Sequence, residues 1–224
     1  MGEGDEHGAV NDSASNRHPL QALIGGPRGA IESMLPPIVF VVAYVASGNS
    51  LNWAVGAALV IGLVLAGLRL WRKERPSRVV GALLVVVIGA LFAYYTGNAV
   101  AYFWPLVLAN IASALAFALS ILVRWPLLGV IVGPLVGTKM RWRQDPDLLR
   151  AYSRASWLWV GLNVIRAAVQ IPLIQGDALW ALAAIRPVFY LLVIGTILLS
   201  WVVIKRSLPP DHPGIRNPRI PQAT

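Results

Sequence analysis

The stretch LNWAVGAALVIGLVLAGLRLWRKERPSRVVGALLVVVIGALFAYY, residues 51–95, decides the fold class. Two apolar runs, at about 51–70 and 79–95, flank the basic loop WRKERPSR at 71–78. A helix needs roughly 20 mainly apolar residues to cross the hydrocarbon core of a bilayer, and each run approaches that length. The stretch therefore predicts two membrane-spanning helices joined by a positively charged loop.

The rest of the chain repeats this pattern. Of its 224 residues, 57% are hydrophobic and 13% are charged, whereas about a quarter of the residues in a soluble domain are charged. Further apolar runs lie at about 30–46, 99–123, 155–174 and 179–204. We expect an all-α integral membrane protein, with a bundle of about six transmembrane helices within residues 23–206.

The two ends of the chain are typical of tails outside this domain. Residues 1–22 are polar and lack the basic and apolar regions of a cleaved signal peptide. Residues 207–224 are rich in proline, which cannot continue a helix. We expect a disordered N-terminal tail and a flexible, proline-rich C-terminal tail.

The distribution of positive charge predicts the orientation. The net charge is +9, and Lys and Arg gather in the loops at 71–78 and 138–154, whereas the turns at 47–50, 96–98 and 175–178 contain none. Cytoplasmic loops of membrane proteins carry an excess of Lys and Arg. We therefore expect a multi-pass protein of the bacterial plasma membrane with both termini in the cytoplasm.

The apolar segment LLGVIVGPLVG at 127–137 is too short to cross the bilayer. If it crossed, the basic loop that follows it would lie outside. We expect a re-entrant or interfacial segment between the fourth and fifth spans, bent at Gly133 and Pro134, which either lines a cavity or lies flat at the interface. Asp145 and Pro146 are then a good N-cap and first position of a helix that continues into the fifth span.

The loop after this segment contains basic residues expected at the level of the lipid headgroups. They are Arg141, Arg143, Arg150 and Arg154. Attraction to anionic lipid, about 1 kcal/mol per basic residue, accounts for them. Membrane lipids are therefore the expected partners, with other membrane proteins or a second copy of the chain as alternatives. Nucleic acid is not expected.

Polar side chains within the spans form the candidate site. Asn163, Arg166 and Gln170 are spaced to share one face of the fifth span, and Arg186 lies in the sixth. Because an arginine in mid-membrane costs roughly 2.5–3.5 kcal/mol on insertion scales, these arginines should face protein or water. They either line a cavity for an anionic group such as a lipid phosphate, or bond to helix carbonyls, Asn110 and tyrosine hydroxyls and lock the bundle.

Two acidic residues are candidates for partners or proton donors. Glu32 follows Arg28 by four residues at the start of the first span, which favours a surface ion pair; a buried acid is the alternative. Asp177 lies in the turn after the fifth span, from which we expect it to reach Arg186 or a neighbour. Other acids are missing from the spans.

Metal and cofactor chemistry is not expected. The chain has no cysteine, and its three histidines, His7, His18 and His212, lie in the polar ends. This excludes a histidine site within the apolar body. Phosphate-binding loops, dinucleotide fingerprints and the HExxH motif are also missing.

Three stretches resemble a known family. They are GGPRGAIESMLPPIVFVVAY at 25–44, RWPLLG at 124–129 and WRQDPDLLRAYSRASWLWVGLNVIRAAVQIPL at 142–173. They are similar to an actinobacterial family of small multi-pass membrane proteins of unknown function, over roughly residues 23–205. The plan resembles, more distantly, the intracellular septation protein A family, which implies a role in envelope integrity or division. The near resemblance implies no activity, so no catalytic residue is assigned.

Three functions compete on these grounds. The favoured one is a non-enzymatic envelope protein that organises partners or lipids. The second is a binder or transporter of an anionic amphiphile through Arg166, Gln170 and Arg186. The third, an intramembrane enzyme acting on an isoprenoid or lipid with Glu32 or Asp177 as its acid, is disfavoured because carboxylates are scarce.

Overall fold

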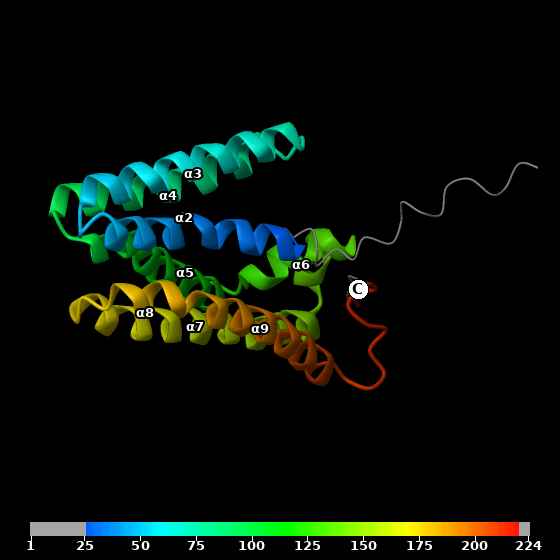
Figure 1. Cartoon of the computed structure of the whole chain (residues 1–224). Coiled ribbons are helices and arrows are strands. Elements are labelled where there is room, and N and C mark those ends of the chain that lie inside the picture. The colour runs from blue at the N-terminus through cyan, green and yellow to red at the C-terminus, as the bar shows by residue number, and fades with distance from the viewer. Residues whose placement is uncertain (1–25, 220–224) are drawn as a thin grey trace, which may run out of the picture.

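The computed structural model describes residues 26–219, except for the side chains of residues 26–28 and 30. The described chain is helical and contains no strand. Figure 1 shows the elements, which are α2 (Gly26–Ala46), α3 (Leu51–Trp71), α4 (Pro76–Thr96), η1 (Ala99–Phe103), α5 (Trp104–Leu122), α6 (Leu127–Val136), η2 (Arg141–Gln144), α7 (Pro146–Gln175), α8 (Leu179–Ala184) and α9 (Arg186–Ser207). The N-terminal tail expected at 1–22 lies outside the described residues.

Five helical segments are long and apolar enough to cross a membrane, so the chain is a membrane-embedded protein. They are α3, α4, η1 with α5, α7, and α8 with α9. The first expected span differs, because the described apolar part of α2 is only Ile31–Ala46, which is shorter than a spanning segment. The part of the chain that the structure describes thus supports five of about six expected spans.

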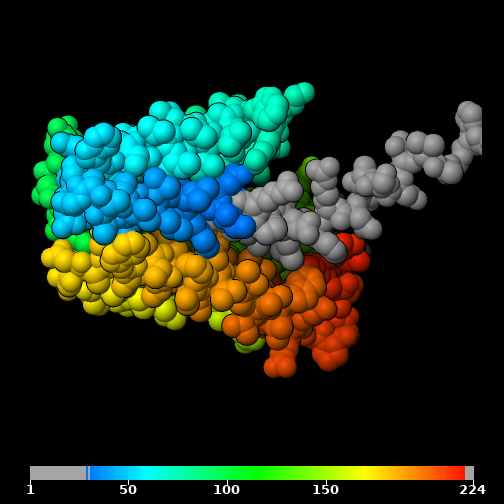
Figure 2. Space-filling model, in the orientation of Figure 1, coloured from blue at the N-terminus to red at the C-terminus, as the bar shows by residue number. Residues whose placement is uncertain are grey.

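The helices form two layers (Figure 1). Helices α2, α3 and α4 pack on one another in the first layer, and α5, α7 and α9 in the second. Figure 2 shows α2 on one face of the molecule, between α3 and the segment formed by α8 and α9. The neutral turns lie at one end of the bundle, and the basic connections and the C-terminal segment lie at the other (Figure 1). We call these the turn end and the basic end.

The larger hydrophobic core joins the two layers at the turn end. It contains residues from α2, α3, α4, η1, α5, α7 and α8. The ring of Phe40 stacks on that of Tyr102 with 4.3 Å between centroids, and both side chains are buried. This core holds η1, which leads directly into α5, against α2.

A second core forms at the basic end, within the second layer. Trp142 and Tyr152 are fully buried there and meet edge to face at 5.4 Å. Helix α6 lies against them and runs without interruption through Gly133 and Pro134 to a left-handed Gly137 (φ 84°). Gly133 and Pro134 therefore lie within one continuous helix, and a bend at these residues stays a prediction.

The small size of Gly133 serves packing instead. A Cβ atom there would lie 2.7 Å from Nε1 of Trp142 and 2.3 Å from the carbonyl oxygen of Lys139. Gly129, one turn earlier, lies against the same indole ring. Whether α6 enters the membrane or lies at its surface stays a prediction.

Candidate functional site: an arginine-lined cavity

A cavity of about 290 Å³ lies between the two layers. Its walls come from α2, α3, α4, the η1–α5 segment, α7 and α9. Most of the lining is apolar, including Pro36, Leu65, Leu83, Leu106 and Phe189. The polar and charged side chains of the lining are Glu32, Ser33, Arg69, Tyr102, Arg166, Arg186 and Tyr190.

Arg166 enters the cavity from α7, as the position of an arginine within an apolar span requires. Its guanidinium carbon lies 5.2 Å from the ring centroid of Phe189 on α9, so the cation is placed near an aromatic ring. Its Nε atom is buried and has no hydrogen-bond partner among the described residues. Arg166 thus offers an unused donor within a largely apolar space.

Arg186 enters the same cavity from the start of α9. One of its terminal nitrogens, Nη1, donates a hydrogen bond of 3.3 Å to the carbonyl oxygen of Ser33 on α2. Its guanidinium carbon lies 5.8 Å from the ring centroid of Phe103. The Nε atom of Arg186, like that of Arg166, is buried without a partner.

The contact between Arg186 and Ser33 follows from a proline in α2. In an α-helix the N–H of each residue donates to the carbonyl four residues earlier. Because proline has no N–H, Pro37 supplies no helical donor to the carbonyl of Ser33, and Arg186 takes that place. The hydroxyl of Ser33 also shares a hydrogen bond with the hydroxyl of Tyr190. Ser33 therefore ties α2 to α9.

Glu32 occupies the part of the cavity nearest the basic end. Its carboxylate accepts hydrogen bonds from Nε of Arg69 at 2.9 Å and from Nη1 of Arg72, both on or next to the end of α3. The side chains of Glu32 and Arg69 are each only 14% exposed. The surface pair expected with Arg28 lies outside the described side chains, and the acid is held by arginines of another helix.

The charges of the lining do not balance. The carboxylate of Glu32 is shared between Arg69 and Arg72, whereas Arg166 and Arg186 form no ion pair with any described acid. The cavity therefore has an excess of positive charge at its deeper part, where low polarity strengthens attraction to an anion.

The other polar residues expected at the site form hydrogen bonds between or within helices and do not line the cavity. Asn110 on α5 donates a hydrogen bond of 2.8 Å to the side-chain carbonyl of Gln170 on α7, and both residues are buried. Asn163 donates to the carbonyl of Trp159 within α7. The locking role that the sequence left open applies to Asn110 and Gln170, whereas Asn163 bonds within its own helix and Arg166 lines the cavity.

Asp177 lies away from the cavity. It adopts a left-handed backbone conformation (φ 51°) in the turn between α7 and α8, and it accepts a hydrogen bond of 3.3 Å from the side chain of Asn98. It forms no ion pair with Arg186. The expected contact is replaced by a link between two turns.

Several cavity residues are missing from the sequence-based prediction. Arg69 reads as the basic end of a span, because its partner Glu32 is 37 positions earlier. Tyr102 and Tyr190 look like ordinary aromatic residues of membrane helices. The spacing of Ser33 and Pro37 is the one available signal, because proline supplies no helical N–H to the carbonyl of Ser33 and a side-chain donor can take that place.

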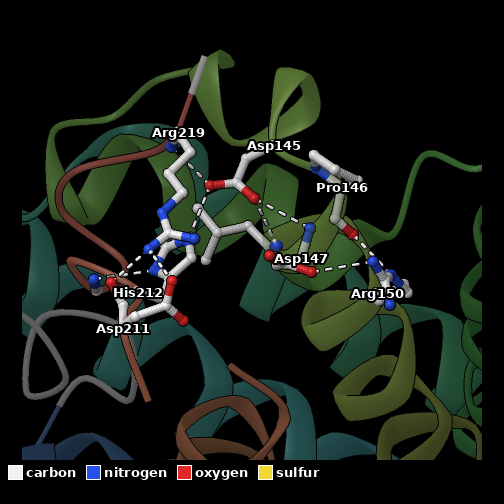
Figure 3. A network of polar contacts seen from close by, with 9 residues as sticks. Asp145, Pro146, Asp147, Arg150, Asp211, His212 and Arg219 are labelled. Carbon is white, nitrogen blue, oxygen red and sulfur yellow. Dashed lines mark hydrogen bonds and ion pairs between the residues drawn. The ribbon is translucent and has the colours of Figure 1, made fainter. Parts of the chain in front are cut away.

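A second polar cluster lies at the basic end, around Asp145 (Figure 3). One carboxylate oxygen of Asp145 accepts the N–H groups of Asp147 and Leu148 at 3.0 and 3.2 Å and so caps α7. The other oxygen lies 2.9 Å from Nε2 of His212 and accepts the backbone N–H of Arg219 at 2.7 Å. The described part of the C-terminal tail thus contacts the start of α7, and the flexibility that the prolines predict stays a prediction.

The surroundings of Asp145 favour its charged form. Burial would raise the pKa of this carboxyl, but the hydrogen bonds from His212 and from the N–H groups of Arg219, Leu148 and Asp147 outweigh burial and hold the pKa below its ordinary value. Asp145 therefore joins the start of α7 to the tail through a carboxylate that stays ionised at neutral pH.

The four arginines expected at the headgroups are exposed at this end. The guanidinium of Arg143 stacks over Trp125 at 3.9 Å, Arg150 pairs with Asp147 at 3.0 Å, and Arg154 bonds to Ser207. Arg141 is exposed in η2. Contact of these residues with lipid stays a prediction. Within the described residues, no cluster of His, Cys, Asp and Glu is arranged to hold a metal ion.

Comparison with known proteins identifies the family of the chain. No curated protein and no solved structure matches it. A family described as "Protein of unknown function (DUF3159)" matches residues 24–211, which include every described helix and the whole cavity lining. This agrees with the resemblance to a family without a known function. The chain belongs to the DUF3159 family.

Proposed function

We propose that this protein binds the anionic group of a membrane amphiphile in its arginine-lined cavity. The observation that carries the proposal is the pair Arg166 and Arg186, each with a buried Nε that has no partner. A buried donor left unpaired costs about 1–3 kcal/mol, more when it is charged. An anionic ligand would satisfy both donors.

Arginine suits such a ligand. Its planar guanidinium matches the geometry of a carboxylate or phosphate and often binds it with two parallel hydrogen bonds. Arg166 and Arg186 come from neighbouring helices, α7 and α9, which pack closely. They line one cavity, so an anion placed between them can accept from both.

The apolar part of the lining favours an amphiphile over a free anion. Side chains from α3, α4 and α5 surround the polar groups, including Leu65, Leu83 and Leu106. Ligand sites that are mostly apolar and contain a few convergent polar groups bind molecules that have both an apolar and a polar part. A lipid with a phosphate headgroup fits this description.

We further propose that the basic end faces the cytoplasm of a bacterial cell and that α2 is a sixth span. Support comes from the basic loops, which lie at one end of the bundle and match the positive-inside rule. Glu32 and Arg69 then lie toward the cytoplasmic leaflet, and Arg166 and Arg186 lie deeper. An amphiphile of that leaflet is the expected ligand.

The cavity favours binding over the partner-organising role and over catalysis. An organising role by itself requires no buried guanidinium groups with unused donors. A catalytic role needs a free acid or base, and among the described residues the one acid of the lining, Glu32, is held by two arginines.

The variants Arg166→Leu and Arg186→Leu test the proposal. We expect native mass spectrometry of the purified protein to show a bound anionic lipid that both variants lose. Arg78→Leu is the matched control, because this exposed residue lies in the first turn of α4 and outside the cavity lining. The same lipid on the wild type and on both variants would overturn the proposal.

Titration with added ligands separates the two sources of an anionic group. We expect farnesyl phosphate to bind the wild type and inorganic phosphate to bind at least a hundredfold more weakly, because only the former uses the apolar walls. Equal affinities would show that the site takes free phosphate and would overturn the amphiphile part of the proposal.

A further inference from the structure

Resting on the binding function proposed above, we infer that Glu32 restricts the cavity to ligands with a single phosphate group. Its carboxylate acts as a tethered anion on Arg69 and Arg72, which are the donors that the second phosphate of a diphosphate would use. Glu32 is thereby a specificity-determining residue of the site.

Glu32 is next to Ser33 in α2, so both residues lie on the side of the cavity that α2 forms. The carbonyl of Ser33 holds Arg186 of the deeper part of the cavity, and the carboxylate of the preceding residue holds Arg69. Two adjacent residues of α2 therefore contact the deep arginine and the outer one. A ligand whose first phosphate lies at Arg166 and Arg186 would direct a second phosphate toward Glu32.

The carboxylate of Glu32 uses both of its oxygens. Oε2 accepts from Arg69 and Oε1 accepts from Arg72, and the Glu32 side chain is only 14% exposed. To bind Arg69 and Arg72, a phosphate has to displace the carboxylate of Glu32. This carboxylate has a high effective concentration because it belongs to the protein itself. It also meets the negative charge of Glu32 in a part of the protein where water screens little.

The charges of the cavity arginines predict which ligands the site prefers. Arg166 and Arg186 lack acidic partners and together match a phosphate group, which carries about two negative charges near neutral pH. Arg69 and Arg72 are already partly neutralised. The site therefore favours phosphate monoesters of an apolar chain over diphosphates of the same chain.

Farnesyl phosphate and farnesyl diphosphate test the inference, because they share one tail and differ by one phosphate. With the full-length purified protein, we expect the wild type to bind the monophosphate more tightly. In Glu32→Gln, the affinity for the diphosphate should rise about tenfold while that for the monophosphate changes less than twofold, since the amide carries no charge and releases Arg69 and Arg72.

Glu74→Gln is the matched control, because it removes the same charge from the exposed loop after α3 without touching Glu32 or the cavity. Its ratio of affinities should equal that of the wild type. An equal rise in Glu74→Gln would show a general effect of net charge and would overturn the role of Glu32.

Glu32→Asp keeps the test valid if the glutamine variant does not fold. The shorter carboxylate retains the charge and one ion pair but cannot reach both arginines, so we expect a rise in diphosphate affinity of about threefold. An unchanged ratio in the folded variants, with farnesyl phosphate still bound through Arg166, overturns the inference alone. Failure of the wild type to bind either compound overturns the proposed function as well.

Discussion

The guanidinium of Arg186 donates to the carbonyl of Ser33 at 3.3 Å, and Pro37 makes this possible because it removes the helical donor of that carbonyl. The proline thus does more than interrupt α2. It turns a backbone oxygen into an acceptor for an arginine of α9, and so fixes one of the two unpaired cations of the cavity.

The variant Pro37→Ala tests this relationship. The new N–H should bond to the carbonyl of Ser33 and compete with Arg186, while the loss of a mid-helix proline favours the helix by up to about 3 kcal/mol. We expect the affinity for farnesyl phosphate to fall several-fold without a loss of thermal stability. Titration and thermal unfolding of the same samples measure both, and Pro172→Ala, which replaces a proline inside α7 away from the cavity lining, is the control. Unchanged affinity in Pro37→Ala would contradict the role given to the carbonyl of Ser33.

The contact of Gly133 with Trp142 predicts a site that does not tolerate a methyl group. In Gly133→Ala the new Cβ would lie 2.3 Å from the carbonyl oxygen of Lys139, so we expect a loss of about 1–3 kcal/mol in stability. Gly161→Ala on α7 meets no atom within 4 Å and should leave stability unchanged or slightly higher. Unfolding in detergent, followed by tryptophan fluorescence, compares the two. Similar stability of both variants would show that α6 moves freely away from Trp142.

The hydrogen bond between Asn110 and Gln170 should stabilise the packing of α5 on α7. Asn110→Ala leaves the buried Gln170 amide without its partner, and we expect a loss of about 1 kcal/mol. A double-mutant cycle with Gln170→Ala measures the coupling between the two residues. Additive effects of the single changes would show that the bond contributes no stability.

The low pKa of Asp145 predicts that the tail is released by acid. A carboxyl whose pKa is lower in the folded protein stabilises it above the ordinary value of about 3.9. That contribution is lost as the pH falls through the folded-state pKa. Hydrogen exchange should therefore show residues 208–219 protected at neutral pH and exposed well below pH 4.

Asp145→Asn separates the two functions of this residue. Asparagine is also a good N-cap, so α7 should stay intact, but its neutral amide should hold His212 and Arg219 weakly. We expect the tail to exchange quickly at neutral pH, with little further change in acid. A tail that stays protected in this variant would show that the apolar contacts of Leu208 and Ile215 suffice to hold it.

The sequence predicts much of the fold and less of the site, for a physical reason. The length of an apolar run and the presence of Arg72 or Lys73 after it are local properties, so spans and loops follow from the chain itself. The partners of Glu32 and Asp145 are not local, because Arg69 lies 37 positions away from the first and His212 lies 67 positions away from the second. Helical spacing predicts that Arg166 and Gln170 share a face, but only packing decides that one meets a cavity and the other meets Asn110.

The two hydrophobic cores differ in whether they contain helices of both layers. The core at the turn end includes helices of both layers, whereas the described residues of the core at the basic end come from α6, η2, α7, α9 and the tail. Toward the basic end, the described links between α2 and α9 include the polar contacts of Ser33 with Arg186 and Tyr190. An apolar core thus joins the two layers at the turn end, whereas toward the basic end polar contacts of Ser33 join α2 to α9.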